Sequence, residues 1–154
     1  GEILAAADAG GDELLLGARG GDPETQPILM RLRSDFVDLC EAAAKGSLNK
    51  VEPQWDTRAA LGVVMAADGY PDSYRKGDAI DGLAGTEDDT VKVFHAGTAV
   101  DGDRVVTAGG RVLCVTALGG DVAEAQANAY RAVERISWAG AYYRRDIGPL
   151  ALSR

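Results

Sequence analysis

The sequence of 154 residues contains a single histidine, two cysteines and few aromatic side chains. No cysteine and histidine spacing suited to zinc can be found, and no serine or cysteine nucleophile pairs recognisably with His95. A Walker P-loop and a dinucleotide-binding fingerprint are absent as well. The residues by themselves therefore contain no self-sufficient catalytic set. We interpret His95 as a structural histidine that ends an apolar strand, with a catalytic base as the alternative.

The chain also lacks a basic patch and a long apolar run. Its net charge is −8, and the only dense basic cluster is Arg144-Arg145, which argues against a nucleic-acid partner. No apolar run approaches the roughly 18 residues of a membrane span, and the first residues lack a signal-peptide pattern. We expect a cytoplasmic protein with no membrane partner. The start at Gly1 rather than Met suggests an excised fragment, a processed product or an engineered chain.

The two cysteines, Cys40 and Cys114, lie within apolar runs. We interpret both as small core side chains in a reducing compartment. A disulfide between them is the alternative, and it requires a geometry that sequence cannot supply.

Hydrophobic periodicity and turn residues predict an α+β fold from about residue 35 onward. Ser34 is the expected N-cap of a helix that ends before Gly46. A buried strand is expected over 58–67. The apolar face predicted for the helix consists of Phe36, Val37, Leu39, Cys40 and Ala43.

The second half of the chain is rich in predicted strands. Alternation and turn residues predict strands over 91–95, 104–107 and 111–116, and the last is apolar on both faces, so we expect it to be central. Asp121 and Glu124 are typical of a capping box before a helix. The apolar positions of that helix are Val122, Ala125, Ala129, Val133 and Ile136. The predicted architecture is a mainly antiparallel sheet with flanking helices, followed by an irregular end over 142–148.

Two glycine-rich turns are candidates for binding chemistry. In the first, over 19–26, the carboxylates of Asp22 and Glu24 are suited to a metal–phosphate complex or a substrate amine. On spacing alone we favour the alternative, in which Asp22 caps a helix entered through Pro23. In the second, Gly109-Gly110 exposes backbone N–H groups and Arg111 is suited to grip phosphate. A β-bulge or a tight hairpin is the alternative there.

A third candidate is the cluster Arg144-Arg145-Asp146. Its two guanidinium groups are suited to an anion, with a solvated ion pair as the alternative.

Seven segments, taken in order, resemble the C-terminal region of phosphoribosylamine–glycine ligase, an ATP-grasp family, over about residues 19–154. Each segment alone is weak evidence for the resemblance, but seven segments in the same order are highly specific evidence for it. They are 21–29 (GDPETQPIL), 33–35 (RSD), 61–67 (LGVVMAA), 69–71 (GYP), 93–98 (VFHAGT), 109–119 (GGRVLCVTALG) and 145–148 (RDIG).

The resemblance implies a ligase of de novo purine biosynthesis. In the full-length family enzyme, ATP with magnesium activates glycine as an acyl phosphate, which the amine of 5-phosphoribosylamine then attacks. The resemblance also implies that residues 1–34 are a rewritten remnant of the ATP-grasp lobe and that residues 35–154 form the C-terminal domain. The implied catalytic residues are Arg19 and Glu24, and the implied substrate-binding residues are Asp22, Gly109, Gly110 and Arg111.

The chain departs from the family pattern just before the first turn. The family strand reads Glu-Phe-Asn-x-Arg-Phe, and its Glu and Asn are magnesium ligands. Here Leu15 and Gly17 stand at those two positions, and only Arg19 is kept. Leucine and glycine side chains offer no oxygen to a hard cation, so we expect no magnesium site and no cofactor on this chain alone.

Three functions remain open from the sequence. The chain is the C-terminal portion of the ligase, inactive alone and completed by an N-terminal ligase fragment. Alternatively, it is a non-catalytic isolated or engineered domain that folds or self-associates through its Ala- and Leu-rich first residues. The third is a module that binds a phosphoribosyl group.

Overall fold

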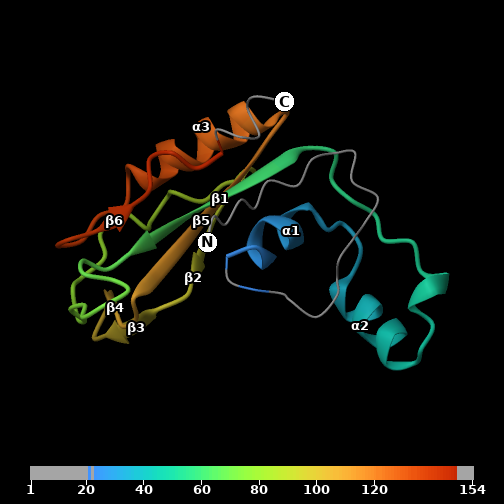
Figure 1. The fold of residues 1–154 in the computed structure, drawn as a ribbon, viewed down its shortest axis with the longest axis horizontal. Helices are drawn as coiled ribbons and strands as arrows, with labels where there is room; N and C mark the ends of the chain where they lie inside the picture. The colour runs from blue at the N-terminus through green and yellow to red at the C-terminus, as the bar shows by residue number, and fades with distance from the viewer. Residues whose placement is uncertain (1–20, 22, 149–154) are drawn as a thin grey trace.

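The computed structural model describes residues 21 and 23–148 of the chain, and Figure 1 shows a sheet with helices on both sides. None of the described helices is long and apolar enough to cross a membrane. The helices are α1 (Thr25–Arg31), α2 (Phe36–Ala44), the short 3₁₀ helix η1 (Leu48–Lys50) and α3 (Val122–Val133). The strands are β1 (Ala59–Ala66), β2 (Val91–His95), β3 (Thr98–Asp101), β4 (Arg104–Thr107), β5 (Arg111–Gly119) and β6 (Tyr142–Tyr143).

The main sheet is antiparallel and has the strand order β2-β5-β1-β6. β1 and β5 pair along their whole length, from Ala59 opposite Gly119 to Ala66 opposite Arg111, with a register shift after Met65. Every residue of β5 after Arg111 is buried. The prediction that this strand is central is therefore confirmed.

Helices cover both faces of the central strands. On one face, Leu61 and Val63 of β1 share the core with Ala129 of α3. On the other face, a Cβ at Gly62 would lie 3.1 Å from Cγ of Pro27, so this glycine leaves room for α1 against the sheet. A strand covered on both faces is expected to be apolar throughout, which explains the composition of β5.

The capping of α3 follows the prediction. The Asp121 carboxylate accepts a hydrogen bond of 2.8 Å from the N–H of Glu124, and the Glu124 carboxylate accepts one of 2.6 Å from the N–H of Gly120. The first bond satisfies an N–H that the first turn of the helix leaves unpaired. The second differs from a standard capping box, because its donor is Gly120, one residue before the N-cap Asp121. Of the predicted apolar positions, Ala125, Ala129 and Val133 are buried in the helix.

The helix predicted after Ser34 forms as α2, but its N-cap is Asp35 rather than Ser34. The Asp35 carboxylate accepts a hydrogen bond of 2.7 Å from the N–H of Val37. Ser34 lies one residue too early and instead accepts a bond of 2.7 Å from the N–H of Gln54. The prediction of Ser34 as the cap was therefore wrong by one residue.

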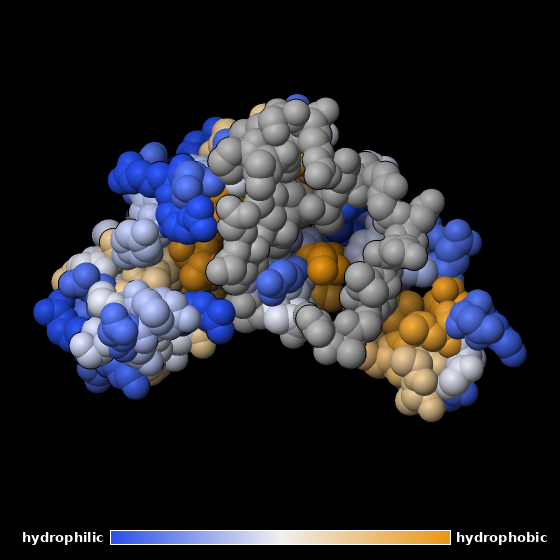
Figure 2. All heavy atoms as spheres, viewed as in Figure 1, coloured by the Kyte–Doolittle hydropathy of each residue, from blue (hydrophilic) through white to orange (hydrophobic). Residues whose placement is uncertain are grey.

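The apolar face predicted for α2 is mostly exposed. Leu39 is buried, whereas Phe36 and Val37 are 46% and 62% exposed. Figure 2 shows hydrophobic side chains gathered on the surface over α2 and η1. Cys114 is buried in β5 as predicted, but Cys40 is exposed on α2, and the two form no disulfide. The prediction of Cys40 as a core side chain was wrong because the helical periodicity gives the face but not what covers it.

The predicted strands over 91–95 and 104–107 form as β2 and β4. The sequence did not predict β3, which pairs with β4 across a turn at Gly102 and makes a separate two-stranded sheet. It also missed β6, whose two residues pair with Met65 and Ala66 at the edge of the main sheet.

The segment after α1 is tied to the chain ahead of β1. Leu32 and Trp55 form an isolated antiparallel bridge, and the N–H of Asp56 donates a bond of 2.6 Å to the carbonyl of Arg31. The α+β class is confirmed, with a solved structure of the same class described below. The division at residue 34 and the ATP-grasp origin of residues 1–34 stay predictions.

Candidate functional site

The first predicted turn lies only partly within the described residues. Arg19 and Asp22 lie outside them, so their predicted roles stay predictions. Glu24 is the half-buried N-cap of α1, and its side chain makes no capping hydrogen bond. The turn is instead closed by Thr25, whose N–H and hydroxyl both donate to the carbonyl of Gly21, at 3.1 and 2.9 Å.

The second predicted turn, Gly109-Gly110, packs against another glycine. The N–H groups of Ala108 and Gly109 donate to the carbonyl of Gly97, at 2.8 and 3.0 Å. A Cβ at Gly109 would lie 3.0 Å from Cα of Gly97, so two backbones meet here without side chains between them. Because the Gly109 N–H already has an acceptor, a bound phosphate would have to contact other groups of this turn.

Gly110 is buried under two tyrosines. A Cβ at this position would overlap the ring of Tyr70 and approach that of Tyr74 to 3.0 Å. The carbonyl of Gly110 accepts a bond of 2.8 Å from the N–H of Ala67. Arg111 follows immediately and is exposed at the start of β5. The packing accounts for both glycines, while the substrate-binding roles of Gly109, Gly110 and Arg111 stay predictions.

His95 lies near the same turn, at the end of β2. It is exposed, and its Nδ1 lies 3.0 Å from the hydroxyl oxygen of Thr98. Its backbone is opposite Leu113 of β5. A histidine with a hydroxyl partner at the end of a strand agrees with the structural interpretation.

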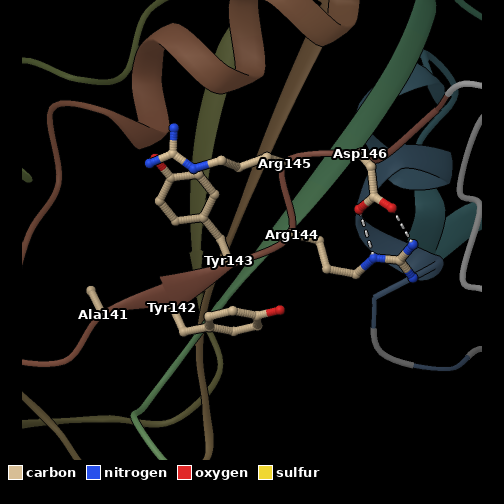
Figure 3. A pocket seen from close by; sticks show the side chains of 6 residues that line it. All are labelled: Ala141, Tyr142, Tyr143, Arg144, Arg145 and Asp146. Atoms are coloured by element: carbon tan, nitrogen blue, oxygen red, sulfur yellow. Dashed lines mark hydrogen bonds and ion pairs between the residues drawn. The ribbon is translucent and has the colours of Figure 1, made fainter.

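The cluster at 144–146 lines a shallow pocket of about 470 Å³ together with the adjoining strand β6. Arg144 makes a bidentate pair with Asp146, with both nitrogen–oxygen distances 2.9 Å. Arg145 lies over the ring of Tyr143, with its guanidinium carbon 5.4 Å from the ring centroid (Figure 3). The solvated ion pair is therefore the arrangement found for Arg144, and the Arg144 guanidinium holds the pKa of Asp146 below its usual range.

The structure brings these candidates to one end of the main sheet. Arg111 of β5 is opposite Ala66 of β1, and Ala66 is opposite Tyr142 of β6. Glu24 is elsewhere, because α1 packs near Gly62, roughly 13 Å back along β1 at the usual rise of a strand. The Gly-Gly-Arg turn and the tyrosine–arginine pocket are thus neighbours across β1.

A charged cluster that the sequence did not predict surrounds Asp56. Arg58 donates to its carboxylate through Nε at 3.0 Å and Nη2 at 2.7 Å, and Nη1 of Arg33 lies 3.8 Å away. These bonds lower the pKa of the Asp56 carboxyl to about 2, chiefly through Arg58. The buried Arg31 also donates to the Asp56 carbonyl at 3.3 Å. Asp56 and Arg58 are two residues apart in the sequence, but Arg31 and Arg33 reach Asp56 only through the fold, so the local sequence does not signal the whole cluster.

The magnesium ion implied by the family resemblance finds no ligand set among the described residues. Within residues 21 and 23–148, no group of three or more His, Cys, Asp or Glu side chains is placed so that it could hold a metal ion. The two family ligand positions, Leu15 and Gly17, lie outside the described residues and carry no side-chain oxygen.

Together the fold and the candidate residues define an α+β domain with an antiparallel sheet and a glycine–arginine turn at one sheet end. The family model described as phosphoribosylglycinamide synthetase, C domain, matches residues 60–149. The chain belongs to this family, as its resemblance predicted.

Relatives and a solved structure extend the similarity beyond that domain. The chain is 56% identical to phosphoribosylamine–glycine ligase of Allochromatium vinosum over 152 residues, which is 99% of this chain and 36% of the relative. It is 59% identical to the Vibrio cholerae ligase over 136 residues, 88% of this chain and 32% of the relative. A crystal structure of the Thermotoga maritima ligase matches with a TM-score of 0.70 at 37% identity, covering 82% and 31% of the two chains. The chain thus spans about a third of the length of these relatives.

Proposed function

We propose that this chain acts as the C-terminal portion of a phosphoribosylamine–glycine ligase of de novo purine biosynthesis, in the cytoplasm. The observation that supports this most strongly is the 56% identity that runs over 99% of the chain. The reaction proposed for the complete enzyme has two steps. The glycine carboxylate attacks the γ-phosphorus of ATP and releases ADP, and the amine of 5-phosphoribosylamine then displaces phosphate from the acyl carbon.

The contribution proposed for this chain is a phosphate-binding site at the sheet end formed by Gly109, Gly110 and Arg111. Arg111 is exposed at the start of β5, directly after a turn whose glycines pack against Gly97 and Tyr70, so its backbone position is fixed by that packing. The planar guanidinium of Arg111 suits the phosphate of 5-phosphoribosylamine, because it can donate two parallel hydrogen bonds to phosphate oxygens. Arg19 and Glu24 are proposed to act on the transferring phosphoryl group, with Asp22 beside the substrate amine.

The chain alone is proposed to be inactive. About two thirds of each relative's length has no counterpart in it, and the resemblance assigns the nucleotide-holding lobe to that part. Activity would then need an N-terminal ligase fragment as partner, together with ATP and magnesium.

A non-catalytic role is the second candidate, and one observation favours it. The sequence has Leu15 and Gly17 at the two positions where the family resemblance implies magnesium ligands. Without side-chain oxygens at these positions the chain would keep the fold and any docking surface but not the chemistry.

A complementation assay tests the proposal. The chain is mixed with the part of the Vibrio cholerae ligase that precedes the matching stretch, and ADP release dependent on glycine and 5-phosphoribosylamine is measured. The Vibrio C-terminal part mixed with the same fragment is the positive control, and Arg111→Ala is the matched variant of this chain.

Three outcomes are informative. ADP release only in the mixture, reduced by Arg111→Ala, is the expected result. Release by the chain alone would overturn the proposed dependence on a partner. No release in a mixture whose Vibrio control is active would favour the non-catalytic role. Calorimetry with glycinamide ribonucleotide then decides whether phosphoribosyl recognition is retained.

A further inference from the structure

The helix α2 has two apolar stripes, and only one of them is covered. Leu39 and Ala42, three positions apart, are buried. Phe36, Cys40 and Ala43 recur at helical spacing on an adjacent stripe, and all three are exposed. An amphipathic helix normally turns its apolar residues toward the protein, so the second stripe lacks the covering that its composition calls for.

The exposed stripe continues onto η1. We call the combined area the α2–η1 surface, where Leu48 is 39% exposed and Val51 is 37% exposed. Contiguous apolar area of this kind marks an interaction site more often than scattered exposed side chains do (Figure 2). The residues of the α2–η1 surface are Phe36, Val37, Cys40, Ala43, Leu48 and Val51.

The position of this surface in the family indicates what covers it. The C-domain model begins at residue 60, so α1, α2 and η1 all precede the family's C domain. The alignment with the Allochromatium relative nevertheless covers 99% of this chain. The α2–η1 surface therefore belongs to the stretch that joins the C domain to the rest of the relatives' chain.

Charge argues against a second copy as the occupant. The segment over 35–52 carries four carboxylates and two lysines, so it is acidic. A two-fold interface would place the same surface of each copy face to face and bring these like charges together. A different polypeptide surface is the better partner.

We propose that the α2–η1 surface is the docking face for the remaining part of the ligase, the polypeptide that precedes the matching stretch in the relatives. The identity of this occupant rests on the proposed function. The contact itself does not require catalysis, because burial of apolar side chains alone can hold two parts of a protein together.

Binding and thiol protection test this contact directly. The preceding part of the Vibrio cholerae ligase is titrated against the chain, and dissociation constants are measured for wild type and Val37→Asp. Val37 is 62% exposed, so we expect the fold to tolerate the substitution and binding to be at least about tenfold weaker. Val100→Asp on β3, where the valine is 77% exposed, is the matched control and should bind as wild type does.

Cys40 provides a second readout without a mutation. It is exposed, whereas Cys114 is buried, so a thiol reagent should label Cys40 first. Complex formation should slow the labelling of Cys40 severalfold. Unchanged labelling in a saturated complex, or equal binding by Val37→Asp and wild type, would overturn the proposal. A chain that forms dimers broken by Val37→Asp would show a second copy to be the occupant instead.

The two proposals can fail separately. Protection of Cys40 with no ADP release would leave the docking face standing and count against the ligase activity. ADP release with unprotected Cys40 would leave the activity standing and remove this docking face.

Discussion

The hydroxyl of Tyr130 in α3 donates a hydrogen bond of 2.8 Å to the carbonyl of Arg144. The same hydroxyl accepts a bond of 3.0 Å from the N–H of Ile147. One side chain thus holds both ends of the segment that carries Arg145 and Asp146. Burial raises the pKa of the Tyr130 phenol, so the hydroxyl keeps its proton at neutral pH and remains a donor.

Removing this hydroxyl should loosen the segment over 144–147. Tyr130→Phe loses both bonds and leaves the Ile147 N–H without its acceptor, which should cost about 1–2 kcal/mol of local stability. The rate of hydrogen exchange at the Ile147 amide measures this loss of local stability. Tyr142→Phe, on a side chain 60% exposed, is the control and should leave that exchange rate unchanged. Equal protection of Ile147 in both variants would contradict the role given to Tyr130.

The Asp56 cluster should make stability depend on pH in the acid range. The folded-state pKa of Asp56, about 2, lies below its ordinary value of 3.8, so its ionised form favours folding. That contribution is fully present above about pH 4 and is lost as the pH falls through about 2. Because the side chains of Arg58 and Arg33 are partly exposed, solvent screens their interaction with Asp56. The contribution of Asp56 to the free energy of unfolding is therefore limited to roughly 1–2 kcal/mol.

Urea unfolding of wild type and Asp56→Asn measures this contribution. The variant should be less stable at pH 5, and the difference should shrink toward pH 2. Asp103→Asn, on the exposed turn between β3 and β4, should show no such convergence. A difference that stays constant from pH 5 to pH 2 would show that ionisation of Asp56 does not stabilise the fold.

Periodicity and turn residues predicted the main elements because those signals are local. The alternation over 91–95, the capping pair Asp121 and Glu124, and the two-sided apolar run of β5 each lie within a dozen residues. β6 was missed because two residues carry no period, and they form a strand only because Met65 and Ala66 present an open edge.

The features that the sequence did not predict depend on distant parts of the chain. Asp56 meets Arg31 and Arg33 only after the chain has folded back over α2 and η1. The exposure of Cys40 likewise depends on which surface faces it, and a helical pattern carries no such information. Among the candidate site residues, the glycines of the second turn were well marked, but the reason for their small size was the packing of Gly97, Tyr70 and Tyr74.

Gly110 should tolerate no side chain while Tyr70 is in place. Gly110→Ala would push a Cβ into the Tyr70 ring and should cost about 1–3 kcal/mol of unfolding free energy. The added substitution Tyr70→Ala removes the ring and should recover part of that loss. Gly120→Ala is the control, since its Cβ would meet only the flexible carboxylate of Glu124. Equal costs at both glycines, with no recovery, would show that packing is not what selects Gly110.

The two positions at which the family resemblance implies magnesium ligands allow a gain-of-function test. Leu15 and Gly17 lie outside the described residues, but the family resemblance puts Glu and Asn at these positions. Leu15→Glu combined with Gly17→Asn supplies the missing oxygens, which hard cations prefer. In the mixture with the Vibrio cholerae fragment, the magnesium concentration for half-maximal ADP release should fall by about tenfold or more.

Controls for this test place the same groups one residue away. Leu14→Glu with Ala18→Asn adds the same charge and amide at positions outside the family pattern, and it should leave the magnesium dependence as in wild type. If both double variants respond alike, the effect is one of general charge and the magnesium positions are assigned wrongly. If only the first variant responds, the absence of side-chain oxygens at positions 15 and 17 is what limits magnesium binding by this chain.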